Sequence, residues 1–224
     1  STSDDCVRVL DSKGRFMMTQ GKFVEAEAMY RRLMQIQNLP ATWLLHGMGS
    51  LASALLNQGK LEEPESLYRQ CVAGCERIRG ASDRHTLSET HNLALVLQRR
   101  GKLSESESLY RKVLANTHVQ RPTTLDMLGY VLSEQGKFEE AERLVRRALT
   151  LQQEQKGKGH PDTLATLNNL AMLLRKMQKL EEAEGLRREE LRIREEKFGP
   201  LNPHTLNSVN NLAVLVLHQG KYEE

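Results

Sequence analysis

Asparagine side chains in the last third of the chain recur at spacings that place them on one helix face. Asn207 and Asn210 are three residues apart, and Asn168 precedes Asn210 by 42 residues. Each side-chain amide carries a donor and an acceptor, so a ladder of them can pair with the backbone of an extended peptide whatever its sequence. Arg175 follows Asn168 by two helical turns and would favour acidic residues in that peptide. These residue types therefore favour peptide binding.

The other reactive side chains do not form the patterns that catalysis or metal binding requires. The sequence contains no glycine-rich phosphate loop, no paired histidines at metalloprotease spacing and no nucleophile elbow. We therefore expect a protein that is not an enzyme, with no catalytic residues and no cofactor. Cys71 and Cys75 lie four residues apart. They are either two small buried residues or a metal-binding pair that acts with His85 or His91. Because no second Cys/His pair stands at ligand spacing, we expect no metal site.

A short phrase, Gly-Lys followed by Phe, Leu or Tyr, indicates how the chain is built. Five copies share the phrase and a sixth has Gln in place of Gly: they begin at Gly21, Gly59, Gly101, Gly136, Gln178 and Gly220. Successive copies are 35 to 42 residues apart. A period of this size is typical of an array of helical hairpins, in which each repeat packs only on its neighbours.

The fifth repeat shows the expected hairpin most clearly. Pro161 stands where proline is favoured, at the start of a helix, and apolar residues then recur at helical spacing from Leu164 to Leu174. A second helix opens at Leu180 with an acidic first turn, which suits the positive end of the helix dipole. One small residue recurs in the second helices and would allow close contact within each hairpin: Ala26, Ser106, Ala141 and Ala183.

These residues resemble the tetratricopeptide repeat, and the longer repeats are similar to those of the kinesin light chain type. The motifs that carry this likeness are His160-Pro161-Asp162-Thr163-Leu164, Asn168-Asn169-Leu170-Ala171, Asn202-Pro203-His204-Thr205-Leu206 and Asn210-Asn211-Leu212-Ala213. The resemblance implies an all-α fold, a right-handed α-α superhelix of about six helical hairpins with the last one truncated. We predict a single array over residues 1–224. Its repeats span about 5–38, 41–80, 83–118, 121–157, 161–199 and 203–224.

The resemblance also implies that the first helices of the hairpins line a concave groove. The groove residues that it implies are His91, Leu95, Tyr130, Asn168, Met172, Arg175, Asn207 and Asn210. Domains of the kinesin light chain type bind short acidic peptides that contain an aromatic residue, and Leu95, Tyr130 and Met172 would receive such an anchor. In the alternative, the asparagines cap or bridge neighbouring helices, and Tyr130 and Met172 pack between hairpins.

The charge distribution and the composition limit the kinds of partner that the chain could bind. The 32 basic and 29 acidic residues are well mixed, and doublets such as Arg146-Arg147 and Arg187-Arg188 follow acidic residues by about one turn. This pattern is typical of solvated helix faces and lacks the basic stripe that nucleic acids require. No apolar run approaches the ~18 residues of a membrane helix, and no secretory signal is visible. Three cysteines form no disulfide framework. We expect a cytoplasmic protein that binds neither nucleic acid nor membrane.

The sequence thus predicts a non-enzymatic scaffold that binds a protein or an extended peptide, acidic or aromatic in character, in its groove. The alternative is a self-associating or regulatory repeat module of a larger adaptor or signalling protein, such as one linked to an ATPase. Because the last repeat stops at Glu224, just as its second helix begins, we expect either that the chain is a fragment of a longer protein or that this uncapped end associates with a second copy of the chain.

Overall fold

The computed structural model describes residues 2–116 and 121–218, and within them it consists of α-helices joined by short connections. The helices are α1 (Thr2–Thr19), α2 (Phe23–Met34), α3 (Ala41–Asn57), α4 (Glu62–Arg79), α5 (Arg84–Arg99), α6 (Leu103–Ala115), α7 (Pro122–Glu134), α8 (Phe138–Lys156), α9 (Pro161–Lys176), α10 (Leu180–Phe198) and α11 (Pro203–His218). They form two compact units, Ser1–Thr117 and His118–Glu224, called here the N-terminal and the C-terminal unit.

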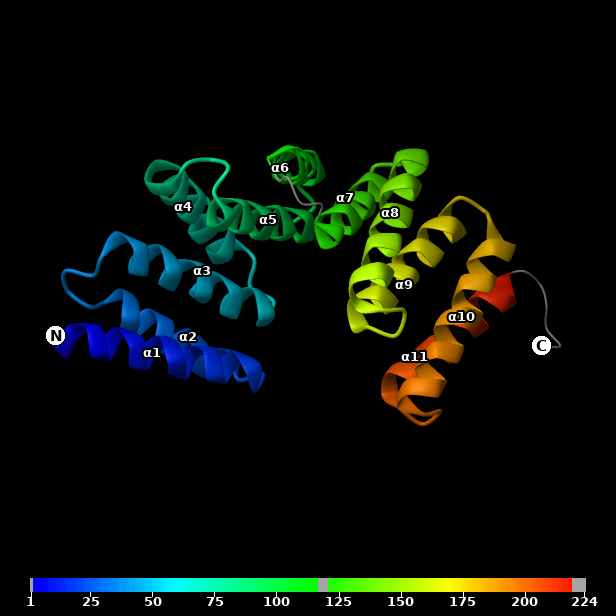
Figure 1. The fold of residues 1–224 in the computed structure, drawn as a ribbon, viewed down its shortest axis with the longest axis horizontal. Coiled ribbons are helices and arrows are strands. Elements are labelled where there is room, and N and C mark those ends of the chain that lie inside the picture. The colour runs from blue at the N-terminus through cyan, green and yellow to red at the C-terminus, as the bar shows by residue number, and fades with distance from the viewer. Residues whose placement is uncertain (1, 117–120, 219–224) are drawn as a thin grey trace. The chain divides into compact units, whose positions relative to one another are not determined.

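Within each unit every helix packs on the one that follows it in the chain. In the N-terminal unit this order runs from α1 to α6, and in the C-terminal unit from α7 to α11, where α7 also contacts α9. Figure 1 shows the antiparallel hairpins that result, for example α1 with α2 and α7 with α8. The predicted all-α class, built from helical hairpins, is confirmed, and this consecutive packing is typical of an α-solenoid. The predicted single array over residues 1–224 stays a prediction.

Small residues hold the two helices of a hairpin close together. Ala26, Ser106, Ala141 and Ala183 are all fully buried. In the fourth repeat the facing first-helix residue is Gly129, and a Cβ added there would lie 2.4 Å from Cγ2 of Val145 in α8. No side chain larger than hydrogen fits at that position without movement of α8, so the sequence sets the spacing of this hairpin.

The turn between the helices of a hairpin explains the glycine of the repeated phrase. The turn glycines at positions 21, 59, 101 and 136 have φ between 71° and 81°, the left-handed region that glycine adopts without a Cβ penalty. Gln178 adopts the same conformation with φ 61°. In that turn the Lys179 N–H donates to the Leu174 carbonyl over 2.9 Å, as Lys137 does to Leu132 in the preceding repeat. The degenerate copy therefore forms the same turn at a conformational cost that glycine avoids.

In three repeats the lysine of the phrase ties its hairpin to the preceding hairpin of the same unit. Its Nζ reaches a glutamate five residues beyond the preceding turn lysine; the pairs are Lys60–Glu27 at 3.0 Å, Lys102–Glu65 at 2.8 Å and Lys179–Glu142 at 2.7 Å. An arginine one turn past each glutamate reaches forward to the next hairpin; these pairs are Arg31–Glu63, Arg69–Glu105 and Arg146–Glu182. This ion-pair ladder gives the phrase a second role, because its glycine turns the chain and its lysine joins the repeats.

Three hairpins are followed by the same connection. A glycine with φ between 83° and 88° ends the second helix, and the residue three positions later caps the next helix; the pairs are Gly80 with Asp83, Gly157 with His160 and Gly199 with Asn202. Each capping side chain accepts a hydrogen bond from the N–H two residues on, as Asp83 does from His85 over 2.9 Å. Such caps satisfy amide groups that have no partner inside the helix.

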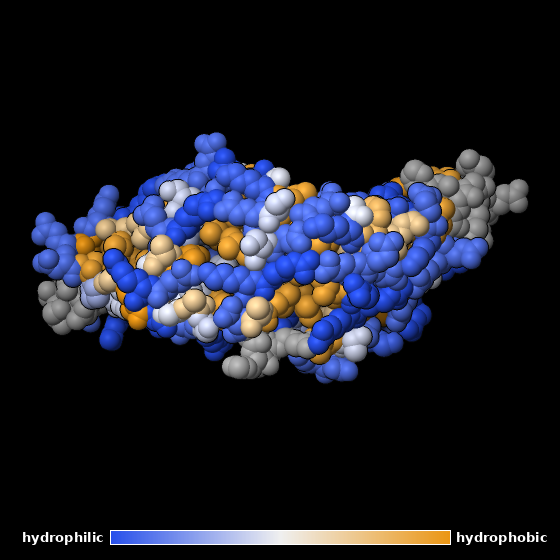
Figure 2. Space-filling model, turned by 90° about the horizontal axis from the view of Figure 1, so that it is seen from above, coloured by the Kyte–Doolittle hydropathy of each residue, from blue (hydrophilic) through white to orange (hydrophobic). Residues whose placement is uncertain are grey.

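Figure 2 shows hydrophilic residues over much of the visible face, with smaller hydrophobic areas between them. Within the described ranges no helix is both long and apolar enough to cross a bilayer. Apolar residues instead pack between the hairpins, as in the cluster around Leu51, Leu55 and Leu97 of the N-terminal unit.

Candidate functional site

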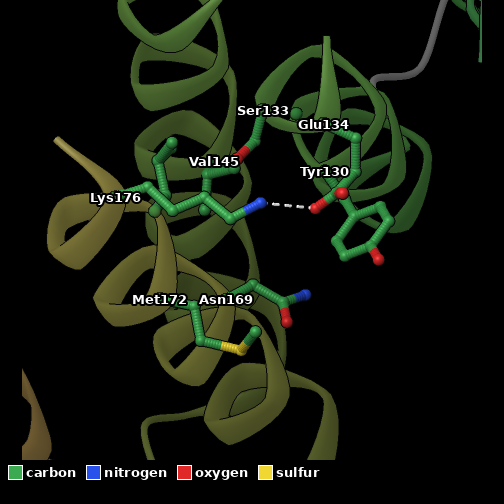
Figure 3. A pocket seen from close by; sticks show the side chains of 9 residues that line it. Tyr130, Ser133, Glu134, Val145, Asn169, Met172 and Lys176 are labelled. Atoms are coloured by element: carbon green, nitrogen blue, oxygen red, sulfur yellow. Dashed lines mark hydrogen bonds and ion pairs between the residues drawn. The ribbon is translucent and has the colours of Figure 1, made fainter. Parts of the chain in front are cut away.

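Helix α9 borders a small, mainly apolar hollow on the side of α7 and α8. The residues that line this hollow are Gly129, Tyr130, Ser133, Glu134, Val145, Asn169, Met172, Leu173 and Lys176. Figure 3 shows Tyr130 and Met172 at its border and the Lys176 side chain reaching across to Glu134, with Nζ 2.5 Å from Oε1. Tyr130 and Met172 are each 36% exposed, which is high for large apolar side chains in a folded protein. They are therefore accessible to a ligand.

A second, more polar pocket lies on the other side of α9, where α10 and α11 pack. Its lining residues are Asn168, Ala171, Met172, Arg175, Arg187, Asn207, Asn211, Val214 and Leu215. Met172 is shared by this polar pocket and by the apolar hollow. Two arginines and three side-chain amides line the polar pocket, and none of the described residues that line it carries a carboxylate. The pocket therefore presents donors for a negatively charged or carbonyl oxygen.

Arg187 reaches the polar pocket from the interior of the hairpin. Its side chain is 8% exposed, and its guanidinium donates to Oδ1 of Asn168 and lies 3.3 Å from Glu190 Oε2. Glu190 is itself 2% exposed and also accepts from Arg194 at 2.9 Å and from Ser208 at 3.2 Å. Burial lowers the pKa of Arg187, and Glu190 opposes that shift. The Arg187 charge is thus only partly compensated by its own chain.

The predicted position of Arg187 on a solvated helix face is wrong, because the residue is only 7% exposed. The residue eight positions after the turn lysine faces the hairpin interior in each repeat, and in the others it is an apolar or tyrosine side chain: Tyr30, Tyr68, Tyr110 and Val145. The residue eleven positions after that lysine is likewise apolar elsewhere: Leu33, Cys71, Val113 and Ala148. The fifth repeat has Arg187 and Glu190 there instead. Alignment of the repeats on their turn lysines would have found both.

The structure places five of the eight predicted groove residues in the two pockets beside α9. Asn168, Met172, Arg175 and Asn207 line the polar pocket, and Tyr130 shares the apolar hollow with Met172.

The other three predicted groove residues lie elsewhere. Asn210 is exposed on α11 but is not among the residues that line the polar pocket. His91 and Leu95 belong to the N-terminal unit, where the His91 ring stands edge-on to Tyr110 at 5.3 Å and Leu95 packs against the core.

The alternative that asparagines bridge helices also describes part of this site. Asn168 of α9 accepts from Arg187 of α10, and its neighbour Asn169 donates to Asp126 of α7 over 2.9 Å. Asn207 differs from both, because it is exposed on α11 at the edge of the pocket. It is the asparagine best placed to meet a ligand.

The two close cysteines are buried side by side on α4. The Cys71 Sγ lies 3.4 Å from the Leu45 carbonyl, and burial raises the pKa of the Cys71 thiol to about 12. That thiol is therefore protonated at neutral pH. Among the described residues no group of three His, Cys, Asp or Glu side chains is placed to hold a metal ion.

The paired helices, their turns and this inter-helix site define a protein built from helical-hairpin repeats. The chain belongs to the tetratricopeptide repeat family, whose model matches residues 41–117, 120–196 and 162–224. Members of this family are typically non-enzymatic, and the repeats imply a protein–protein interaction scaffold. A search of curated proteins finds no match.

Solved structures share the fold at low sequence identity. A Podosopora anserina protein described as a kinesin light chain with nearly identical TPR-like repeats is 23% identical, with a TM-score of 0.69 over 86% of this chain and 96% of that one. BtubC (BKLC) from P. vanneervenii is 18% identical, with a TM-score of 0.72 over 86% and 81% of the two chains. The quorum sensor NprR from B. thuringiensis is 16% identical, with a TM-score of 0.75 over 97% and 60%. The predicted likeness to repeats of the kinesin light chain type is confirmed.

Proposed function

We propose that the C-terminal unit is a non-enzymatic binding module for an extended peptide, which lies across α9. The single observation that carries this proposal is that Met172 borders both the apolar hollow and the polar pocket. An apolar or aromatic side chain of the peptide would pack on the exposed side chains of Tyr130 and Met172, and an acidic residue would face Arg175. Two adjacent pockets of different polarity are a common basis for sequence-selective peptide recognition.

Asparagine side chains supply the contacts to the peptide backbone in this proposal. Asn207 lies at the edge of the polar pocket, and Asn210 is exposed one turn further along α11. Asn168 is held by Arg187 and would turn its remaining amide group toward the peptide. The equivalent residue in the fourth repeat is Asp126, which pairs with Asn169 and so does not face an acidic ligand directly.

A display screen with random peptides tests this proposal. Peptides selected on the wild-type chain should combine an aromatic or large apolar residue with an acidic one. The Asn207→Ala variant should bind these peptides more weakly, by about 1–3 kcal/mol. Asn57→Ala is the matched control, because Asn57 is exposed on α3 and its Nδ2 bonds only to the Ser53 carbonyl of its own helix. If Asn207→Ala and wild type bind the peptides equally well, the polar pocket is not part of the peptide-binding site.

Self-association is a second candidate, favoured by one face of α11. Leu206, Val209, Ala213 and Leu217 recur at helical spacing and are all exposed. An apolar stripe of this kind suits contact with a second copy of the chain. Light scattering over a hundredfold range of concentration tests it: the molar mass should rise with concentration in wild type and stay constant in Leu206→Gln with Leu217→Gln. A strict monomer in wild type would contradict it.

A further inference from the structure

The buried ion pair of the fifth repeat is costly, and the other hairpins avoid it. Taking a guanidinium and a carboxylate out of water costs several kcal/mol for each ion, so a buried pair seldom stabilises more than apolar residues of similar volume. At the same two interior positions the fourth repeat has Val145 and Ala148. The fold of the hairpin therefore does not require Arg187 and Glu190.

The geometry directs the Arg187 charge toward the polar pocket. Glu190 contacts Arg187 through Oε2 at 3.3 Å, while its Oε1 accepts from Arg194 at 2.9 Å and from Ser208 at 3.2 Å, so that one carboxylate serves two arginines. The remaining contact of the Arg187 guanidinium is the neutral amide oxygen of Asn168, at the wall of the pocket. An arginine that is 7% exposed and shares its carboxylate partner with Arg194 stabilises an incoming anion strongly, because little water competes for it.

The rest of the pocket continues this donor surface. Arg175 is exposed two turns along α9 from Asn168, and the amides of Asn207 and Asn211 face the same space from α11. Val214 and Leu215 close the pocket with apolar surface. A buried cation, an exposed cation and several amide donors line this pocket and suit one anionic group.

We propose that the polar pocket is an anion subsite in which Arg187 and Arg175 together hold one carboxylate or phosphate group of the ligand. The proposal rests on the proposed function only for the source of that group, a side chain of the bound peptide. In that complex Arg187 would exchange its contact with Asn168 for the anion, and Glu190 would continue to neutralise Arg194.

Arginine side-chain NMR on the ¹⁵N-labelled chain tests the subsite without any peptide. Sodium glutarate and inorganic phosphate serve as probes, with sodium chloride at equal ionic strength as the reference. We expect the Nε–Hε signal of Arg187 to move saturably with one or both probes, while the signal of Arg192 does not, since Arg192 pairs with Glu196 on an exposed face. Parallel, unsaturable shifts at both arginines would mean an adventitious ion only and would overturn the proposal.

Three variants separate binding from folding. Arg187→Tyr with Glu190→Ala installs interior residue types that other hairpins use, so it should unfold at the same or a higher temperature and bind the probes about tenfold or more weakly. Arg175→Gln changes an exposed side chain and should lower the affinity for the probes by about threefold to tenfold. Arg192→Gln is the matched control. Unchanged probe affinity in a folded Arg187→Tyr, Glu190→Ala variant would contradict the proposal even if Arg175→Gln has an effect.

The source of the anion follows from peptide variants. In a peptide selected on the wild-type chain, each acidic residue is replaced in turn by its amide and by phosphoserine, and the affinities show whether the subsite prefers a carboxylate or a phosphate. If glutarate or phosphate binds but the screen yields no peptide, the subsite stands and the proposed function fails. If peptides bind equally well to wild type and to Arg187→Tyr with Glu190→Ala, the proposed function stands and the subsite fails.

Discussion

Asn169 of α9 donates a hydrogen bond from its Nδ2 to Oδ2 of Asp126 of α7, over 2.9 Å and between two adjacent repeats. The Asp126 side chain is one of the few buried carboxylates among the described residues of the C-terminal unit, with 4% of the residue exposed. This contact joins the first helices of two hairpins beside the apolar hollow. It also gives the hollow a titratable group.

The stability of the chain should depend on pH through Asp126. Burial raises the pKa of this carboxyl from 3.8 to about 6, and the bond from Asn169 opposes the shift. Because the folded-state pKa lies above the unfolded one, ionisation destabilises the fold: the cost is absent below about pH 4 and complete above about pH 6. Asp126→Asn should therefore be more stable than wild type by about 1–3 kcal/mol at neutral pH, with no difference near pH 4, in urea unfolding.

Glu27 provides the opposite control for that measurement. Burial alone would raise the pKa of this carboxyl, but hydrogen bonds from Gln58, Lys60 and Arg31 outweigh it and lower the pKa to about 2. Stabilisation by a depressed pKa is present above the unfolded value and is lost as pH falls through the folded one. Glu27→Gln should thus destabilise the chain at neutral pH and lose its effect only between about pH 4.5 and pH 2. If Asp126→Asn and Glu27→Gln changed stability with the same dependence on pH, the opposite pKa shifts of these two carboxyls would be contradicted.

Gln178→Gly should stabilise the chain by about 1 kcal/mol, because it removes a side chain from the left-handed conformation. The gain should be seen as a higher midpoint in thermal or urea unfolding. Gly136→Gln is the reciprocal variant and should lose about as much, since Gly136 has φ 77° in the equivalent turn. A loss of stability in Gln178→Gly would show that the glutamine side chain makes a contact that outweighs the backbone cost.

Gly129→Ala should destabilise the fourth hairpin by about 1–3 kcal/mol, the usual cost of overpacking a close contact. The added Cβ would lie 2.4 Å from Val145 Cγ2, and valine cannot rotate away easily because its χ1 is restricted. Val145→Ala in the same chain should restore part of the loss. Calorimetry on the two single variants and the double variant measures this coupling, and strictly additive effects would argue against the contact.

The ion-pair ladder should be stronger than exposed ion pairs. Glu65 has 8% of its side chain exposed and lies 2.7 to 2.8 Å from Arg69, Arg100 and Lys102. A double-mutant cycle with Glu65→Gln and Lys102→Met should give a coupling of about 0.5–3 kcal/mol. The exposed pair Arg192–Glu196 is the reference and should give about 0–1 kcal/mol, falling with salt. Equal couplings for the two pairs would contradict a structural role for the turn lysine.

The repeated phrase predicted the hairpins well because its chemistry is local. Glycine at a left-handed turn and an acidic first turn at Leu180 depend on neighbours in sequence, and the second helices begin at Phe138 and Leu180, within two residues of the turn. The ladder was harder to foresee, since Lys102 and Glu65 are 37 residues apart. Such contacts depend on how hairpins stack.

The candidate site was predicted only in part, for a similar reason. Asn168, Met172 and Arg175 share a face of one helix, so their spacing alone placed them together. Arg187 was missed because it stands beside Arg188, which does pair with Glu184 one turn earlier as on a solvated face. Adjacent residues of a helix are separated by a rotation of about 100° around its axis, which is enough to move a side chain from solvent to the interior.

Methyl NMR of the eight methionines tests the central claim, that a peptide lies across α9. Met172 borders both pockets, whereas Met48 is buried in the N-terminal unit, and Met172→Leu assigns the signal. On titration with a peptide from the display screen, we expect a saturable shift of the Met172 methyl signal and none for Met48. Saturable binding that leaves Met172 unchanged and shifts methionines of the N-terminal unit would contradict it.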